Sequence, residues 1–118
     1  MITGNLISLG LVGTNSEGTY NVLAPFACHV HDVLAVAQNS DIGDDDTVVV
    51  KNGLGGTTIG TATFGSTIAA GAKATYEATD ADQEIAKDGI IQVVVSALAA
   101  ETDRVHVTLV LDPYMLES

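Results

Sequence analysis

The residues best suited to chemistry in this sequence are two histidines separated by a valine, His29 and His31. On a β-strand, side chains two positions apart point to the same side, so both imidazoles could bind one divalent cation. A complete site needs further ligands. Asp32 would point to the opposite side of the strand, the next carboxylate is Asp41, and His106 could approach only from another strand. Because the ligand set is incomplete, the pattern favours surface histidines, and we assign no metal ligand.

Residues 41–46 form an acidic run that could surround a calcium ion, because hard cations prefer oxygen ligands. The run does not follow the EF-hand pattern, since its oxygens do not alternate in the required way and no closing glutamate follows. We interpret it as a solvated loop, although the sequence leaves cation binding open.

Residues 53–56, Gly-Leu-Gly-Gly, have the composition of a loop that cradles phosphate. Such a loop must lead into a helix whose amino end holds the phosphate, whereas residues 57–61 are mainly strand formers. The tip of a hairpin is the better interpretation, because Asn52-Gly53 is the strongest hairpin signal in the chain.

Nucleophilic or acid-base catalysis has little support. Cys28 and His29 are neighbours in sequence and would therefore point to opposite sides of a strand, which prevents proton transfer between them. We expect Cys28 to be a small buried filler. Asp80 and Asp82 could act as an acid-base pair on a sugar, but the chain has no tryptophan to form a stacking platform. We predict no catalytic residue and no enzymatic activity.

The elements that position these residues are predicted to be strands. The chain contains 14 Val, 8 Ile and 13 Thr, which are β-branched and pack well on a pleated surface. Residues 79–87 are the exception, because Asp80 with Gln83 could begin a short helix as readily as an extended segment. Apolar runs separated by turn signals predict strands at residues 6–12, 19–24, 27–38, 47–51, 57–64, 73–78, 90–97 and 104–111.

The predicted strands differ in which of their faces is apolar. In residues 104–111, Val105, Val107 and Leu109 alternate with polar residues, which predicts one buried and one solvated face. In residues 27–38, strict alternation would place Cys28, Val30, Asp32, Leu34 and Val36 on one side.

The length of 118 residues predicts a single domain. The expected fold is an all-β, antiparallel β-sandwich or jelly roll of about eight strands. Residues 1–12 are a candidate for an extended N-terminal segment, and residues 113–118 are a candidate C-terminal tail.

The formal net charge of −11 restricts the partners of the chain. Only four residues are basic and they are scattered, so we expect no binding to nucleic acid or to an anionic membrane surface. Cys28 is the only cysteine, which favours folding in a reducing compartment. The sequence shows neither a secretory signal nor a continuous apolar stretch long enough for a membrane span, so we expect synthesis as a soluble protein in a cytoplasm.

Four stretches together resemble the small β-sandwich decoration, or head cement, proteins of tailed bacteriophage capsids. They read VLAPFACHV at residues 22–30, DTVVVKNG at 46–53, IGTAT at 59–63 and DGIIQVVVS at 88–96. The resemblance implies a homotrimer that binds the major capsid protein on the outer surface of the virion and needs no cofactor.

Within this hypothesis the chain ends supply the contacts. Shell contacts are expected from the amino-terminal segment and subunit contacts from the carboxyl end, although apolar residues at chain ends also serve ordinary packing. The expected contact residues are Ile2, Leu6, Ile7, Tyr114, Met115 and Leu116.

Two alternatives remain open. One is a receptor-binding module of a phage fibre or tail, which would also be all-β and acidic. The other is a cupin-like metal-dependent enzyme that would use His29 and His31. Cupins place a glutamate closely after these histidines, and this chain has none there.

Overall fold

The structure is a computed structural model that describes residues 7–10, 18–37, 46–65, 71, 73–80, 83–96 and 105–113. These residues form strands and turns, and they include no helix long and apolar enough to cross a membrane. The strands are β1 (Ile7–Gly10), β2 (Gly18–Leu23), β3 (Cys28–Ala37), β4 (Thr47–Asn52), β5 (Thr57–Thr63), β6 (Thr75–Ala78), β7 (Ile90–Ser96) and β8 (Val105–Pro113).

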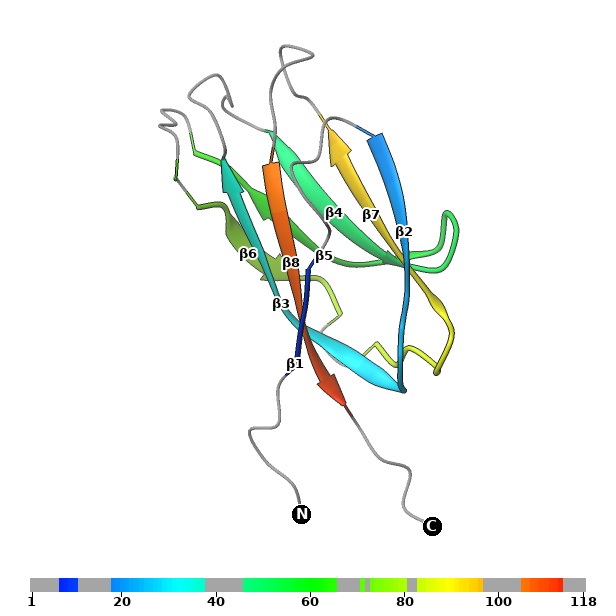
Figure 1. The fold of residues 1–118 in the computed structure, drawn as a ribbon. Helices are drawn as coiled ribbons and strands as arrows, with labels where there is room; N and C mark the ends of the chain where they lie inside the picture. Colours follow the sequence, from blue (N-terminus) through cyan, green and yellow to red (C-terminus); the bar gives the residue numbers. More distant parts are fainter. Residues whose placement is uncertain are drawn as a thin grey trace.

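The strands form two antiparallel sheets (Figure 1). The smaller sheet has the order β1-β8-β3 and the larger has the order β2-β7-β4-β5-β6. All of the registered strand pairs run antiparallel. The predicted all-β, antiparallel class is therefore confirmed.

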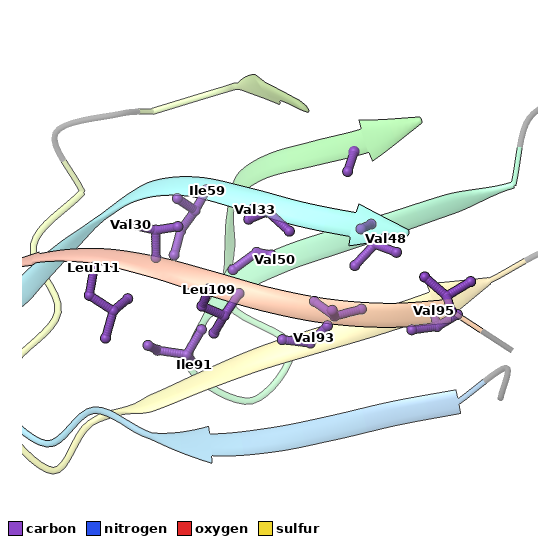
Figure 2. Packing of buried hydrophobic residues seen from close by; sticks show 14 of the residues in the cluster. Val30, Val33, Val48, Val50, Ile59, Ile91, Val93, Val95, Leu109 and Leu111 are labelled. Carbon is purple, nitrogen blue, oxygen red and sulfur yellow. The ribbon is translucent and has the colours of Figure 1, made fainter. Parts of the chain in front are cut away.

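The hydrophobic core lies between the two sheets, as Figure 2 shows for the labelled residues. The alternation predicted for β8 is confirmed, because Val105, Val107, Leu109 and Leu111 are all 0% exposed. From the larger sheet, β4 contributes Val48 and Val50, and β7 contributes Ile91, Val93 and Val95. Each such aliphatic side chain stabilises the fold by about 1.5–3 kcal/mol when it is fully buried.

The strict alternation predicted for residues 27–38 is wrong because β3 contains a β-bulge. Val30 pairs with Leu111 and Asp32 pairs with Val110, so His31 is the extra residue. The side chain of Asp32 accepts a hydrogen bond from its neighbour, Val33 N–H to Asp32 Oδ1, at 2.8 Å. The bulge reverses which positions face inward. Beyond it the buried residues are Val33, Ala35 and Ala37, whereas Leu34 is exposed.

The hairpin predicted at Asn52-Gly53 is confirmed. Asn52 is the last residue of β4 and pairs with Thr57, the first residue of β5, across the turn of residues 53–56. Gly53 and Gly55 have φ angles of 88° and 64°, a left-handed conformation that glycine adopts without steric cost.

Residues 79–87 do not form a helix where they are described. The Gln83 side chain donates to Asp80 Oδ2 at 3.0 Å, and Gln83 N–H donates to Asp80 O at 3.2 Å. Farther along, Ile85 and Cys28 exchange two backbone hydrogen bonds, both 2.9 Å long. Ile85 is 1% exposed, so burial of its side chain accompanies the extended alternative.

Outside the named strands, backbone contacts connect β3 of the smaller sheet to segments that lead into the larger sheet at two places, which we call the first and second seams. At one of them, the isolated bridge between Cys28 and Ile85 connects the start of β3 with the segment before β7. At the other, Ala74 N–H donates to Ala35 O at 2.9 Å, next to a bridge between Val36 and Lys73. The chain continues directly from that bridge into β6 of the larger sheet.

Tyr76 on β6 packs over a glycine beside the second seam. A Cβ atom built on Gly60 would overlap the hydroxyl and the ring edge of Tyr76. The Tyr76 hydroxyl is buried and has no hydrogen-bond partner among the described residues. Gly60 therefore makes room for an aromatic ring whose packing, rather than a hydrogen bond, holds it against the core.

We expect Gly60→Ala to lower the free energy of unfolding by about 1–3 kcal/mol, because the new methyl group displaces the Tyr76 ring. The measurement is chemical denaturation. Gly65→Ala is the matched control: Gly65 is exposed, and no heavy atom lies within 4 Å of a Cβ built there. Equal stability of the two variants would contradict the proposed packing.

Candidate functional site

The three histidines do not converge. His29 pairs with Asp112 near one end of the β3–β8 pair, and His106 pairs with Val36 near the other. The six-residue separation along β8 corresponds to roughly 20 Å. His31 occupies the bulge between them and is exposed. The described residues contain no group of three or more His, Cys, Asp or Glu side chains that could hold a metal ion.

Cys28 is fully buried and lies on the core side of β3, as predicted. Burial raises the pKa of the Cys28 thiol, and the negative charge of Asp112 raises it further. A high thiol pKa lowers the thiolate fraction, and the thiolate is the nucleophilic form. The structure therefore gives this side chain a packing role.

The other predicted site residues have separate outcomes. Residues 53–56 form the tip of the β4–β5 hairpin, as expected. Asp46 is described and buried, and its carbonyl accepts a hydrogen bond from Phe64 N–H at 3.0 Å. Residues 41–45 and Asp82 lie outside the described residues, so the calcium and acid-base interpretations stay predictions.

The predicted contact residues at the chain ends also stay predictions. Ile7 is the first residue of β1 and pairs with Leu111 in the smaller sheet. The remaining ones lie outside the described residues, namely Ile2, Leu6, Tyr114, Met115 and Leu116.

A candidate that sequence reasoning missed is the outward face of the larger sheet, which we call the neutral face. Residues of this face that pair across neighbouring strands form rows that cross the sheet. The central row crosses all five strands, and a second row runs beside it over four of them. The rows are Thr19-Val94-Val49-Thr61-Glu77 and Asn21-Gln92-Lys51-Thr58, flanked by Thr47-Thr63-Thr75 on one side and Leu23-Ile90 on the other.

The electrostatics of this face differ from those of the whole chain. Its only charged side chains are Lys51 and Glu77, which have opposite signs, whereas the chain carries a formal net charge of −11. The face is otherwise made of hydroxyl, amide and aliphatic groups. Val49 and Val94 are half-buried at its centre, and Leu23 is 63% exposed at its margin.

Gln92 fixes the hairpin tip against the neutral face. Its side-chain oxygen accepts a hydrogen bond from Gly55 N–H at 3.1 Å, and its Nε2 donates to Asn21 Oδ1 at 3.2 Å. Gln92 is 9% exposed, so these bonds satisfy a nearly buried amide. Side-chain hydrogen bonds of Gln92 thus connect β2, β7 and the hairpin tip at this face.

The geometry of the neutral face suits non-covalent contact. Threonine hydroxyls and amides can donate and accept hydrogen bonds, and the valines between them supply apolar area. In the sequence, residues 48–50 are three consecutive valines, and in the structure a β-bulge interrupts the pairing of β4 with β5, so side-chain alternation does not indicate which positions face outward. The partner strands, and hence the rows, could not be read from that pattern.

Comparison with known proteins identifies no relative: no protein-family model, no curated protein and no solved structure matches this chain.

We expect the native protein to bind no transition metal through its histidines, because His106 lies roughly 20 Å from His29 along the β3–β8 pair and the described residues supply no third ligand for His29 and His31. In thermal denaturation, added Zn²⁺ should leave the Tm of the wild type unchanged, and it should also leave the Tm of His31→Ala unchanged. A zinc-dependent rise in Tm that His31→Ala abolishes would contradict this expectation, and elemental analysis of the purified protein provides an independent check.

We also expect the Cys28 thiol to react with iodoacetamide much more slowly in the native protein than in guanidinium chloride. Burial both shields the thiol and raises its pKa. Mass spectrometry of the alkylated protein measures the rate. Equal rates in the two conditions would show that Cys28 is accessible.

The raised pKa of the Cys28 thiol also predicts a pH dependence of the free energy of unfolding. The unfolded chain releases the Cys28 proton near the ordinary pKa of 9.0, and the folded chain releases it at a higher pH. The protonated Cys28 thiol therefore makes its full contribution to the free energy of unfolding below pH 9, and this contribution is lost as the pH rises through the folded-state pKa. Cys28→Ala should show a smaller alkaline loss than the wild type in denaturation measured from pH 8 upward.

Proposed function

We propose that this protein is a structural component of a tailed-phage virion that binds the outer surface of the capsid shell as a trimer and stabilises the shell by contact. The observation that carries the proposal is the neutral face, a near-neutral surface built across all five strands of a sheet in a strongly acidic chain. The resemblance of four sequence stretches to capsid decoration proteins supplies the biological setting.

The fold that accompanies this proposal is a jelly roll, which consists of two sheets. In a jelly roll of eight strands, the first strand pairs with the last, the second with the seventh, the third with the sixth and the fourth with the fifth. Three observed pairs follow this pairing: β1 with β8, β2 with β7, and β4 with β5. The remaining pair is supported at the second seam, where Gly71 N–H donates to Ala37 O at 2.8 Å and Ala74 N–H donates to Ala35 O at 2.9 Å. These bonds join β3 to the segment that precedes β6.

Charge makes the neutral face the most favourable described surface for contact. An acidic chain repels other acidic surfaces, and burial of an unpaired charge is costly. The other described acidic residues lie outside the rows of the neutral face: Asp32 and Asp112 are on the smaller sheet, Asp80, Glu84 and Asp88 precede β7, and Asp46, which precedes β4, is buried. Docking through the neutral face therefore buries few charges.

The size of the face favours action by several copies together. Five strands spaced about 4.8 Å apart, each with four to seven residues rising about 3.3 Å, cover on the order of 400 Å². A specific interface usually buries about 800 Å² on each partner. One such face supports only weak binding, whereas three linked copies gain avidity on a symmetric shell.

A receptor-binding fibre module would use similar surface chemistry but usually adds aromatic side chains as rigid anchors. None of the described residues in the rows of the neutral face is aromatic; Tyr20 on β2 and Tyr76 on β6 pack against the core. This observation favours docking on a broad protein surface.

We expect the purified wild-type protein to be a trimer in native mass spectrometry and to saturate expanded, undecorated shells made from the major capsid protein of the same genome. Val94→Lys adds a charge at the centre of the neutral face and should weaken shell binding by about tenfold or more, because that charge must be desolvated on docking.

Leu34→Lys is the matched control, since Leu34 is 46% exposed on the outer side of β3 in the smaller sheet. It should bind shells as the wild type does, and circular dichroism should show that both variants are folded. A monomeric wild type that does not bind shells would refute the function. Equal weakening by both variants would remove the neutral face as the docking surface.

A further inference from the structure

We propose that Asn52-Gly53, at the tip of the β4–β5 hairpin, is a latent site of spontaneous deamidation that the native fold keeps closed and that opening of the tip makes reactive. This inference is independent of the proposed function. It rests on hydrogen bonds that hold both reacting groups, the Asn52 amide and the Gly53 backbone nitrogen.

The chemistry requires only water. The backbone nitrogen of Gly53 loses its proton and attacks Asn52 Cγ, a new C–N bond forms, and the Cγ–Nδ2 bond breaks as ammonia leaves with that proton. Water then opens the resulting ring at either carbonyl carbon, giving aspartate or isoaspartate. Because glycine has no Cβ, it hinders the attack less than any other residue, and asparagine is a thermolabile residue in proteins.

The fold restrains the nucleophile. Gly53 N–H donates a hydrogen bond of 2.8 Å to the carbonyl oxygen of Ile90 on β7. A donor in such a bond keeps its proton, and the deprotonated nitrogen is the form that attacks. The bond must therefore break before the ring can close.

The fold also restrains the electrophile. Asn52 Nδ2 donates to Gln83 Oε1 at 3.0 Å and to Glu84 O at 3.2 Å. These two bonds direct the amide toward the segment before β7, on which the Gln83 and Glu84 acceptors lie. Together with the Gly53 bond, they anchor the dipeptide at three points that are far from it in the sequence.

Asp80 fixes the direction of the Gln83 amide. Gln83 Nε2 donates to Asp80 Oδ2 at 3.0 Å, and an ionised carboxylate can only accept. Gln83 must therefore present its oxygen, rather than its nitrogen, to Asn52. The order Asp80, Gln83, Asn52 is a directed chain of hydrogen bonds in which an amide, not a carboxylate, fits at position 52.

Deamidation would damage the same contacts that prevent it. An aspartate at position 52 would place a carboxylate against Gln83 Oε1 and the Glu84 carbonyl oxygen, which are both acceptors. Gln83 could rotate its amide to donate, but it would then lose its bond to Asp80. Deamidation is irreversible, so a modified tip would remain loosened. The fraction of modified chains would therefore report how often the tip had opened.

The experiment follows deamidation of the full chain at pH 8 and 37 °C by peptide mass spectrometry, with isoaspartyl methyltransferase labelling as a second readout. The native wild type should react about tenfold or more slowly than the chain in urea at the same pH, since several hydrogen bonds must open first. Asn21, which precedes Val22, serves as an internal reference for a hindered asparagine.

Two variants test the restraint. Gln83→Ala removes one of the two hydrogen bonds that Asn52 Nδ2 donates, and Asp80→Ala leaves Gln83 in place but frees its orientation. Both should react faster than the native wild type while circular dichroism stays native, and Asp80 is exposed, so its substitution does not threaten folding. The proposal fails if native wild type and urea-unfolded chain react equally fast, or if neither folded variant reacts faster than the wild type.

Discussion

Burial of one aliphatic layer between two antiparallel sheets is the constraint on which the rest of this structure depends. The layer is made almost entirely of valine, isoleucine, leucine and alanine, with Phe64 as its largest side chain. β-Branched side chains have few rotamers, so they lose little entropy when they are fixed on a pleated surface. Because the core side of β3, β4, β7 and β8 is filled in this way, the outward positions of these strands are left for contact with solvent or with a partner.

Two side-chain amides of the larger sheet are held by contacts distant in sequence. Gln92 connects β2, β7 and the hairpin tip, and Asn52 connects that tip to the segment before β7. A buried amide without partners would cost about 1–3 kcal/mol, so the Gln92 hydrogen bonds favour the observed position of the tip. Side-chain hydrogen bonds therefore connect the hairpin tip to β7 on one side and to the segment before β7 on the other.

The separation of charge from the neutral face connects the fold to the proposed function. Two opposite charges, Lys51 and Glu77, lie on a surface to which five strands contribute, and the other described acidic residues lie elsewhere. An acidic exterior suppresses non-specific association, and a near-neutral face permits specific contact. Such a division of the surface suits a protein that acts by binding to a shell.

The sequence by itself determined the all-β class, the buried face of β8, the β4–β5 hairpin and the burial of Cys28, because each follows from side-chain alternation or from turn chemistry within a few residues. Tertiary structure decided the rest. The bulge at His31 reversed the faces of β3 beyond it, since adding one residue shifts a two-residue period by half. Pairing of Ile85 with Cys28 selected an extended segment where local signals allowed a helix. The rows of the neutral face depend on strand order and register, which arise from contacts between residues far apart in the chain.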